Sequence, residues 1–287
     1  MERELWPTVY RLLRDEGADF SQKSVPYQPW LIVAVLFWAA LHDRPRYWAC
    51  DPKNWATTTT RPAALPSPSA LSRRARLLAV GWLMRAVEDR LRRAAEPTLV
   101  SCLDGKPLPV GSRSADPDAR PKGPFGPGYK LHAIWAGQPA PAAWEMTAAG
   151  VGEAPVAERL VSRVDSGGYL VADGNYDSGP LFDAAARSGY QMVVDHWRPN
   201  AGTGHRRQSP HRLRSIALRP TAFGRALYAV RGGIERSFGN AVGFAGGLGP
   251  LPAWVRRWHR VDCWVSAKLT INAVRIVRKQ GLMAAMQ

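Results

Sequence analysis

Three acidic residues stand where the fold could bring their carboxylates together. Asp104 follows the apolar run 99–103, and Asp173 follows the apolar run 168–172. Each run is long enough for one strand, and in an open sheet of parallel strands functional groups collect at the carboxyl ends of the strands. Glu235 lies in a later segment of helical character. Carboxylates held close together raise each other's pKa unless a cation sits between them, so these three residues are candidate metal ligands.

Such a site would support metal-assisted cleavage of a phosphodiester. Mg²⁺ prefers oxygen ligands and keeps several of its waters. Two such ions roughly 3.5–4 Å apart activate a water molecule or a 3′-hydroxyl and stabilise the leaving oxygen of an in-line displacement. We therefore expect two Mg²⁺ ions at these acids, with Mn²⁺ able to substitute. Position alone leaves a plainer interpretation open, because an Asp that follows a strand is often a turn residue.

The segment around Glu235 has a spacing that can present several polar groups together. Tyr228, Arg231 and Glu235 follow the pattern Y-x2-R-x3-E. A helix that starts at Arg231 places Arg231 and Glu235 one turn apart on the same face. Ile234 and Phe238 are also four residues apart and can face a core. This segment therefore predicts a packed helix with a carboxylate and a guanidinium side by side.

Composition points to a folded protein with a polyanionic partner. The chain has 287 residues and a formal net charge of +16, from 39 Lys and Arg against 23 Asp and Glu. Nucleic acid is the commonest partner of such a chain; a basic protein in which Arg is simply frequent is the alternative. Hydrophobic residues make up 46% of the sequence, which excludes a disordered protein. The length suggests one large or two modest domains.

Cysteine usage and hydropathy bear on the compartment. Cys50, Cys102 and Cys263 are far apart and form neither a CxxC pair nor a zinc-binding spacing. An odd number of cysteines in a chain of this size favours a reducing compartment. Residues 1–5 lack the basic start and apolar stretch of a signal peptide, and the apolar run 30–41 is too short to span a bilayer. We expect a soluble, cytoplasmic protein.

Residues 1–96 are predicted to form an α-helical DNA-binding region. A serine just before 70–78 can cap a helix there, with Arg73 and Arg74 in its first turns. The helical pattern can continue to residue 93. A capped helix with basic residues near its start is what a helix-turn-helix protein places in the major groove. A solvated basic face on a core helix is an equal alternative.

From residue 97 the pattern changes to strands that alternate with helices. Strands are predicted at 99–104, 129–135, 142–146, 169–173 and 190–194, and helices at 154–164 and 180–187. The strand 129–135 alternates apolar with polar residues, as a half-buried strand does. The series favours parallel pairing with covering helices and hence an α/β fold.

The remainder of this second domain, 97–287, is predicted to contain a basic loop and a terminal helix. The loop spans 197–220 and includes Arg206 and Arg207, which are expected to follow DNA phosphates. The terminal helix is predicted over 253–278, where Trp and Val recur near helical spacing.

Four short motifs occur in one order along the chain. They are Asp104-Gly-Lys-Pro-Leu-Pro-Val110, Gly128-Tyr-Lys-Leu-His132, Ala172-Asp-Gly-Asn-Tyr-Asp-Ser178 and Tyr228-x2-Arg231-x3-Glu235. From about residue 98 to the C-terminus, the chain resembles the DDE transposases of bacterial insertion sequences, of the insertion-sequence-four and -five type. The helical region before residue 97 also fits that resemblance, as a DNA-binding region placed ahead of the catalytic domain.

The resemblance implies an RNase H-like catalytic domain with a mixed sheet whose Asp-bearing strands lie side by side. It implies binding of terminal inverted repeats, then metal-dependent cleavage and strand transfer into target DNA at the bacterial nucleoid. Asp104, Asp173 and Glu235 would be the metal-binding triad, and Tyr228 and Arg231 would contact DNA near the cut. The resemblance also favours a phosphate contact for Lys130. A homodimer is expected, because two DNA ends must be held together.

One position departs from the family pattern. The signature often continues with a Lys seven residues after the Glu, and that position is Val242 here. This departure motivates an alternative, a catalytically inactive relic that still binds DNA. A structure-specific RNase H-like nuclease, which would cut without joining ends to a target, is the other alternative.

Overall fold

The computed structural model describes residues 2–21, 25–56, 58–110, 115–121, 126–164, 167–196, 202–203, 207–243 and 247–286. The chain forms two compact units. The helical unit comprises Met1–Ala95, Arg113–Asp118 and Asn240–Gln287, and the sheet unit comprises Glu96–Ser112 and Ala119–Gly239. One division falls between Ala95 and Glu96. The C-terminal segment, which the sequence assigns to the second domain, groups instead with the N-terminal helices.

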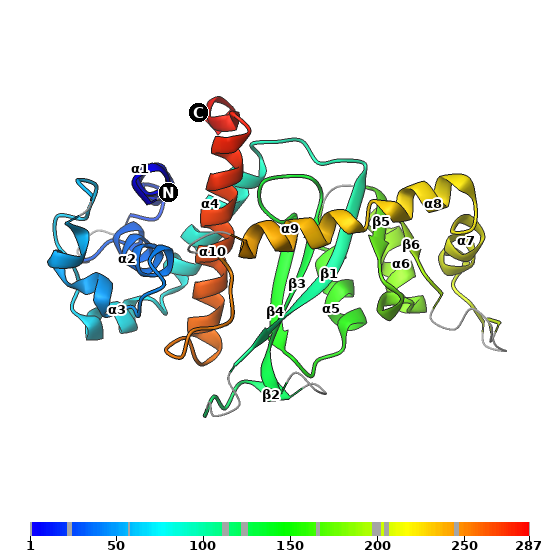
Figure 1. Ribbon diagram of the computed structural model, residues 1–287, viewed down its shortest axis with the longest axis horizontal. Helices are drawn as coiled ribbons and strands as arrows, with labels where there is room; N and C mark the ends of the chain where they lie inside the picture. Colours follow the sequence, from blue (N-terminus) through cyan, green and yellow to red (C-terminus); the bar gives the residue numbers. More distant parts are fainter. Residues whose placement is uncertain are drawn as a thin grey trace. The chain divides into compact units, whose positions relative to one another are not determined.

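The helical unit is built around the C-terminal helix. Its helices are α1 (Glu2–Gly17), α2 (Pro29–Leu41), α3 (Pro68–Arg74), α4 (Leu78–Arg92) and α10 (Trp258–Lys279), with short 3-10 turns at η1 (Trp48–Cys50), η2 (Pro52–Trp55) and η5 (Leu282–Met286). Helix α10 packs against α1, α2 and α4 (Figure 1). Most of its side chains are buried, including Val261, Leu269 and Ile271. This burial explains why the C-terminal segment belongs to the helical unit.

The apolar run 30–41 forms a buried helix, as its composition predicts. Helix α2 is apolar on all sides, and such a helix belongs in a core. Trp38 of α2 is fully buried and stacks on Trp55, with ring centroids 4.7 Å apart and an interplanar angle of 14°. Trp6 of α1 lies against both rings. Of the helices that the structure describes, none has both the length and the apolar character needed to cross a membrane.

Two helix predictions in this unit need correction. The helix expected from residue 70 to residue 93 is interrupted between α3 and α4, where Leu77 is extended (φ −68°, ψ 140°). Arg73 and Arg74 therefore lie in the last turn of a short helix, not in the first turns of a long one. The terminal helix begins at Trp258, because Arg257 has a left-handed backbone (φ 69°) that ends the preceding turn.

The sheet unit contains a mixed sheet. Its strands are β1 (Val100–Pro109), β2 (Arg120–Pro121), β3 (Pro127–Trp135), β4 (Ala143–Ala148), β5 (Gly168–Ala172) and β6 (Tyr190–Val194). The order is β2-β3-β1-β5-β6, with β4 also paired to β3. Strand β3 is antiparallel to β1, β2 and β4, whereas β5 is parallel to β1 and β6. The two Asp-bearing strands, β1 and β5, are therefore neighbours.

Helices cover both faces of this sheet. On one face, α5 (Glu153–Val161) and α6 (Gly179–Arg187) pack through Leu160 and Phe182 on Leu103 and Leu170 of the strands. On the other face lie α8 (Ala222–Ala229) and α9 (Gly232–Val242), and the ring of Phe238 meets that of Trp135 edge-on at 6.2 Å. Figure 1 shows α9 crossing the sheet on the side opposite α5. The predicted α/β class with covering helices, preceded by N-terminal helices, is confirmed.

The segment predicted as a basic loop contains a helix. Helix α7 (Pro210–Leu218) begins after Ser209, whose hydroxyl accepts hydrogen bonds from the backbone N–H groups of His211 and Arg212. The prediction of a loop throughout 197–220 is therefore wrong for this part; a serine cap followed by proline at the first helical position was the signal for it.

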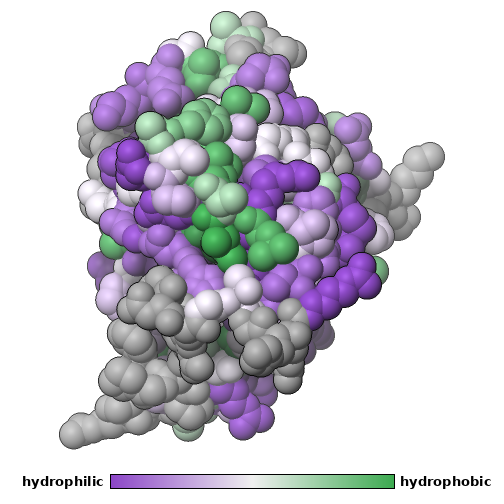
Figure 2. All heavy atoms as spheres, turned by 90° about the vertical axis from the view of Figure 1, so that its right-hand side faces the viewer, coloured by the Kyte–Doolittle hydropathy of each residue, from purple (hydrophilic) through white to green (hydrophobic). Residues whose placement is uncertain are grey.

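Helices α7 and α8 also carry apolar surface. Figure 2, seen from the side that bears them, shows a hydrophobic patch bordered by hydrophilic side chains. Leu213 and Phe223 are exposed on these helices, and the Phe223 ring packs edge-on against Tyr169 of β5 at 5.5 Å.

Candidate active site

Strand pairing brings Asp104 and Asp173 to corresponding positions. The parallel ladder of β1 and β5 pairs Cys102 with Val171, and continuing this register by two residues aligns Asp104 with Asp173. Neighbouring strands lie about 4.8 Å apart, and side chains alternate between the faces. Both carboxylates therefore start from adjacent strands on the same face of the sheet, which is the face covered by α8 and α9.

The two aspartates differ in how their strands end. Asp173 directly follows β5, as predicted. Its carboxylate accepts hydrogen bonds from the backbone N–H of Asn175 at 2.9 Å and from the Asn175 side-chain amide at 3.2 Å. Asp104 does not end its strand, because β1 runs on to Pro109 beside β3. It lies instead where β1 passes beyond the end of its pairing with β5.

The charge balance at Asp104 is that of a partly buried carboxyl beside a second acid. Burial raises the pKa of Asp104, and the nearby Asp173 raises it further. The backbone N–H of Gly105, which donates to Asp104 Oδ1 at 2.7 Å, lowers this pKa, and Lys130 and Arg231 lower it as well. A carboxylate in this setting gains from an added cation, because a cation removes the repulsion that raises its pKa.

Glu235 lies on α9 and is paired with Arg231. Arg231 Nη2 is 3.4 Å from Glu235 Oε1, so the predicted one-turn spacing of this pair is confirmed. The Glu235 side chain is 65% exposed. Within the described ranges, no group of three Asp, Glu, His or Cys side chains is close enough to hold a metal ion. The structure thus places Asp104 and Asp173 at aligned positions of neighbouring strands, and it pairs Glu235 with Arg231, whose charge also lowers the pKa of Asp104.

Lys130 is buried next to this site and makes an ion pair that the sequence did not reveal. It is only 8% exposed, and its ammonium contacts the carboxylate of Glu153 in the first turn of α5. Gly105 makes room for it, since a Cβ at that position would clash with Lys130 Cε. The expected exposed phosphate contact therefore does not match the position of Lys130, because its charge is directed to Glu153 inside the protein.

Tyr176 completes the buried surroundings of the two aspartates. Its ring is fully buried in the core between the sheet, α5 and α6. Burial raises the pKa of Tyr176 well above its ordinary value, and the carboxylates of Glu153, Asp104 and Asp173 raise it further. Tyr176 thus stays protonated in the core on the α5 and α6 side of the sheet.

Tyr228 lies in α8, Glu235 lies in α9, and Arg231 lies in the turn between these helices. The chain turns between α8 and α9, so the three residues of the Y-x2-R-x3-E pattern do not form one continuous helical turn. The guanidinium of Arg219 lies 3.9 Å from the centre of the Tyr228 ring. Burial, with a hydrogen bond to Asp195, raises the pKa of Tyr228 to about 12. Asp195 also pairs with Arg219 at 2.8 Å, so both polar ends of this cluster are engaged within the protein.

Comparison with known proteins decides the family. The family described as transposase DDE domain matches residues 95–245, which is more than half of the chain. The chain belongs to this family. It is therefore a DDE transposase, an enzyme that cleaves DNA and transfers strands, and members of the family generally use divalent metal ions.

No curated protein matches this transposase. Among solved structures, it is similar to the piggyBac transposase in a cryo-EM synaptic complex with hairpin DNA, at 10% sequence identity and a TM-score of 0.44, covering 97% of this chain and 74% of that one. The assignment rests on the family match.

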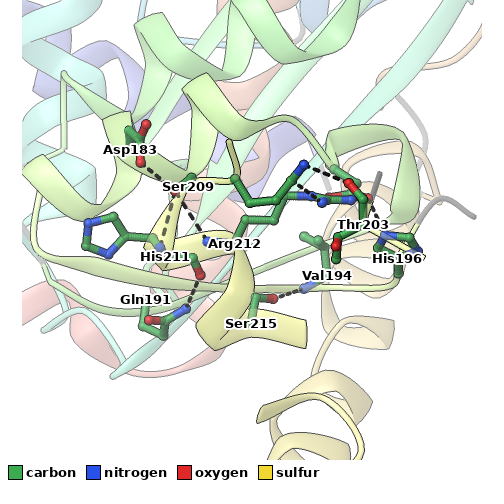
Figure 3. A network of polar contacts seen from close by, with 11 residues as sticks. Asp183, Gln191, Val194, His196, Thr203, Ser209, His211, Arg212 and Ser215 are labelled. Atoms are coloured by element: carbon green, nitrogen blue, oxygen red, sulfur yellow. Dashed lines mark hydrogen bonds and ion pairs between the residues drawn. The ribbon is translucent and has the colours of Figure 1, made fainter. Parts of the chain in front are cut away.

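A polar network fixes the loop that follows Asp173 in this transposase. Asp177, whose side chain is 2% exposed, accepts hydrogen bonds from Arg212 Nε at 2.6 Å and from Arg212 Nη2 at 2.7 Å. Figure 3 shows Arg212 among the polar residues that join α7 to β6 and to α6, including the Ser209 hydroxyl bonded to Asp183 of α6. The network connects the Asp173 loop to the basic segment, and sequence reasoning missed it because 35 residues separate Asp177 from Arg212.

The other predicted DNA contacts are distributed over the transposase. Arg73 is exposed and Arg74 is half-buried on α3 of the helical unit, and Arg207 is exposed before α7 of the sheet unit. Arg206 lies outside the described residues. These arginines stay predictions for phosphate contact.

Proposed function

We propose that this chain is the transposase of a bacterial insertion sequence of the four or five type. It binds the terminal inverted repeats of its element, cleaves the strands there and joins them to target DNA. The observation that carries the proposal is the alignment of Asp104 with Asp173 on neighbouring parallel strands, with Asp173 raising the pKa of Asp104. A mixed sheet with its Asp-bearing strands side by side is also what an RNase H-like domain requires.

The donor set at this position suits Mg²⁺. Asp104 and Asp173 offer carboxylate oxygens, and hard divalent cations take oxygen ligands. We assign Glu235 as the third ligand, because its exposed carboxylate is held by Arg231, which also acts on Asp104. When bound, two Mg²⁺ ions supply activation of the attacking hydroxyl and stabilisation of the leaving oxygen, and Mn²⁺ is expected to substitute.

The protein groups around the acids hold them ready for this chemistry. The Asn175 hydrogen bonds orient Asp173, and the Gly105 N–H orients Asp104. Lys130 and Arg231 favour the ionised form of Asp104, which is the form that binds a cation. Arg231 is also a predicted DNA contact, and its guanidinium would offer a paired set of donors to a phosphate near the acids.

The remaining assignments concern DNA outside the cleavage site. Tyr228, Arg73, Arg74, Arg206 and Arg207 are proposed as contacts to double-stranded DNA. We expect a homodimer in the complex that holds two element ends, acting at the nucleoid. The net charge of +16 supports this role, since neutralising phosphates supplies most of the sequence-independent affinity for DNA.

The test is an in vitro reaction on labelled DNA that carries the gene's own flanking sequences, with Mg²⁺ or Mn²⁺. Wild type is expected to cut at fixed flanking positions. Asp104→Ala, Asp173→Ala and Glu235→Ala are each expected to lose at least about 100-fold in cleavage rate, because a metal ion contributes several kcal/mol to the transition state. DNA binding in EDTA should be unchanged in all three variants.

Glu158→Ala, which removes another acid of the sheet unit on α5, is the matched control and should cleave like wild type. Retention of cleavage in Asp104→Ala would contradict the proposal. Binding without cutting in wild type with either metal would support the relic alternative, and Val242→Lys would then be the first substitution to restore activity.

A further inference from the structure

The helical unit contains a pocket that the proposed catalytic role does not use. Its volume is about 380 Å³, within the range of sites that hold small ligands. Residues of α2, of the turn 44–47, of α3, of the segment 253–256 and of α10 line it. Every lining residue belongs to the helical unit, so the pocket is a property of that unit alone.

The pocket lining is strongly cationic. Four arginines line it, Arg44, Arg46, Arg256 and Arg260, and no Asp or Glu is among the described residues that line it. Nη2 of Arg46 is buried and has no hydrogen-bond partner within the described part of the chain. Burial and repulsion from Arg260 lower the pKa of Arg46. Cations gathered without a carboxylate are costly unless an anion joins them, so the pocket favours an anionic ligand.

The same pocket also presents aromatic and apolar surface. Tyr47 and Trp254 line it and are 66% and 41% exposed. Leu36, Leu71 and Trp264 supply more apolar lining. A simple phosphate or an acidic side chain would use the arginines and leave these rings in water. A ligand that uses both features carries a flat apolar body next to a negative charge, as a nucleotide does.

We propose that this pocket binds one nucleotide, with its base against Trp254 and Tyr47 and its phosphate at the arginines. Two sources share this chemistry: an unpaired nucleotide within DNA, and a free nucleotide. The first source rests on the proposed function, which makes DNA the substrate, and the second does not. Base stacking on aromatic side chains tolerates any base sequence, and such stacking can offset the few kcal/mol that taking a base out of a duplex costs.

The test compares three probes in EDTA, where no cleavage occurs. They are a duplex with one unpaired 2-aminopurine, the same duplex fully paired, and free 2-aminopurine deoxynucleoside monophosphate. Wild type is expected to bind the unpaired duplex or the free nucleotide with a change in 2-aminopurine fluorescence. Trp254→Ala is expected to weaken that binding by about 5- to 100-fold and to abolish the fluorescence change.

Arg260→Ala should weaken binding of the same probe and reduce its dependence on salt, because one phosphate contact is lost. Trp82→Ala and Arg11→Ala remove an exposed Trp and an exposed Arg of the same unit that do not line the pocket, and both should bind like wild type. All four side chains are exposed or partly exposed, so thermal midpoints should be unchanged.

The outcomes separate this proposal from the proposed function. Asp104→Ala should bind every probe like wild type, since the catalytic acids lie in the other unit. Loss of the unpaired-duplex signal in Trp254→Ala assigns the pocket to DNA, and loss of the free-nucleotide signal assigns it to a free nucleotide. If Trp254→Ala and Arg260→Ala bind both probes with the affinity of wild type, the proposal is overturned, whether or not the enzyme cleaves DNA.

Discussion

Lys130→Met tests whether the buried ion pair beside Asp104 supports the sheet unit. The substitution keeps most of the side-chain volume and removes the charge that contacts Glu153. The two side chains are only 10% and 9% exposed, so Glu153 would keep a buried charge after losing the ammonium group of Lys130. Breaking a buried pair in this way costs about 3–5 kcal/mol. For a unit of this size, that loss lowers the thermal midpoint by about 6–20 °C.

The assay is urea and thermal unfolding of the full chain in EDTA at neutral pH, followed by circular dichroism. Lys130→Met/Glu153→Gln is expected to recover at least half of the lost stability, because it leaves no uncompensated charge. Arg159→Met is the matched control. It removes one Arg from the pairs with Glu145 on the same unit, where Arg159 is 49% exposed, and should cost less than about 1 kcal/mol.

Two results would refute this reasoning. One is a loss in Lys130→Met no larger than that of the surface control. The other is a double variant as unstable as the single one, which would mean that Lys130 acts through packing and not through its charge.

Three other substitutions probe the acids and the helical core. Asp104→Asn should raise the thermal midpoint of the metal-free protein at pH 7, because the folded state raises the pKa of Asp104 and so disfavours its ionised form. The gain in thermal midpoint should shrink as the pH falls through that raised pKa. A gain that persists at low pH would contradict this prediction. Asp177→Asn should lower the free energy of unfolding in urea by about 3 kcal/mol, because it leaves the charge of Arg212 uncompensated. It should also slow cleavage, because it frees the loop after Asp173. Unchanged stability would show that the Asp177–Arg212 pair is dispensable. Trp38→Ala should cost about 3–5 kcal/mol, because it empties a fully buried position in the helical unit, and a fall in thermal midpoint smaller than that of Trp82→Ala would contradict this packing argument.

The sheet could be predicted largely from its apolar runs. The main error in that prediction, the end of the first strand, has a physical cause. The prediction ended the first strand at residue 104, before Gly105, Pro107 and Pro109. In the structure β1 continues through all three, paired with β3 on one side only. Pairing with β5 stops at Cys102, so the other edge of this part of β1 has no ladder to interrupt. Proline lacks an N–H and is tolerated at such an edge.

The candidate site was predictable where spacing or topology fixes it. Arg231 and Glu235 form their pair because four residues make about one helical turn. Asp104 and Asp173 are aligned because both follow apolar strand segments that pair in parallel. The placement of Tyr228 was not predictable in this way. Tyr228 and Arg231 are three residues apart, and this spacing does not reveal whether one helix continues from Tyr228 to Arg231 or ends between them. The break after Ala229 depends on how α8 packs against β5 and β6.

The role of Lys130 shows what an alternating pattern leaves open. The alternation in 129–135 predicted a strand with one solvent-exposed face. Residues 128–135 are instead all buried, because β1 and β4 flank the strand and helices lie over the sheet. The polar residues on it therefore need partners inside the protein. Lys130 has Glu153, and His132 Nε2 lies 2.9 Å from the Thr147 hydroxyl. A period of two identifies which residues share a face, but whether that face meets water depends on elements distant in sequence. Polar residues that alternate along a strand next to candidate metal-binding acids should thus be tested first as an interior polar layer, and only then as contacts to DNA.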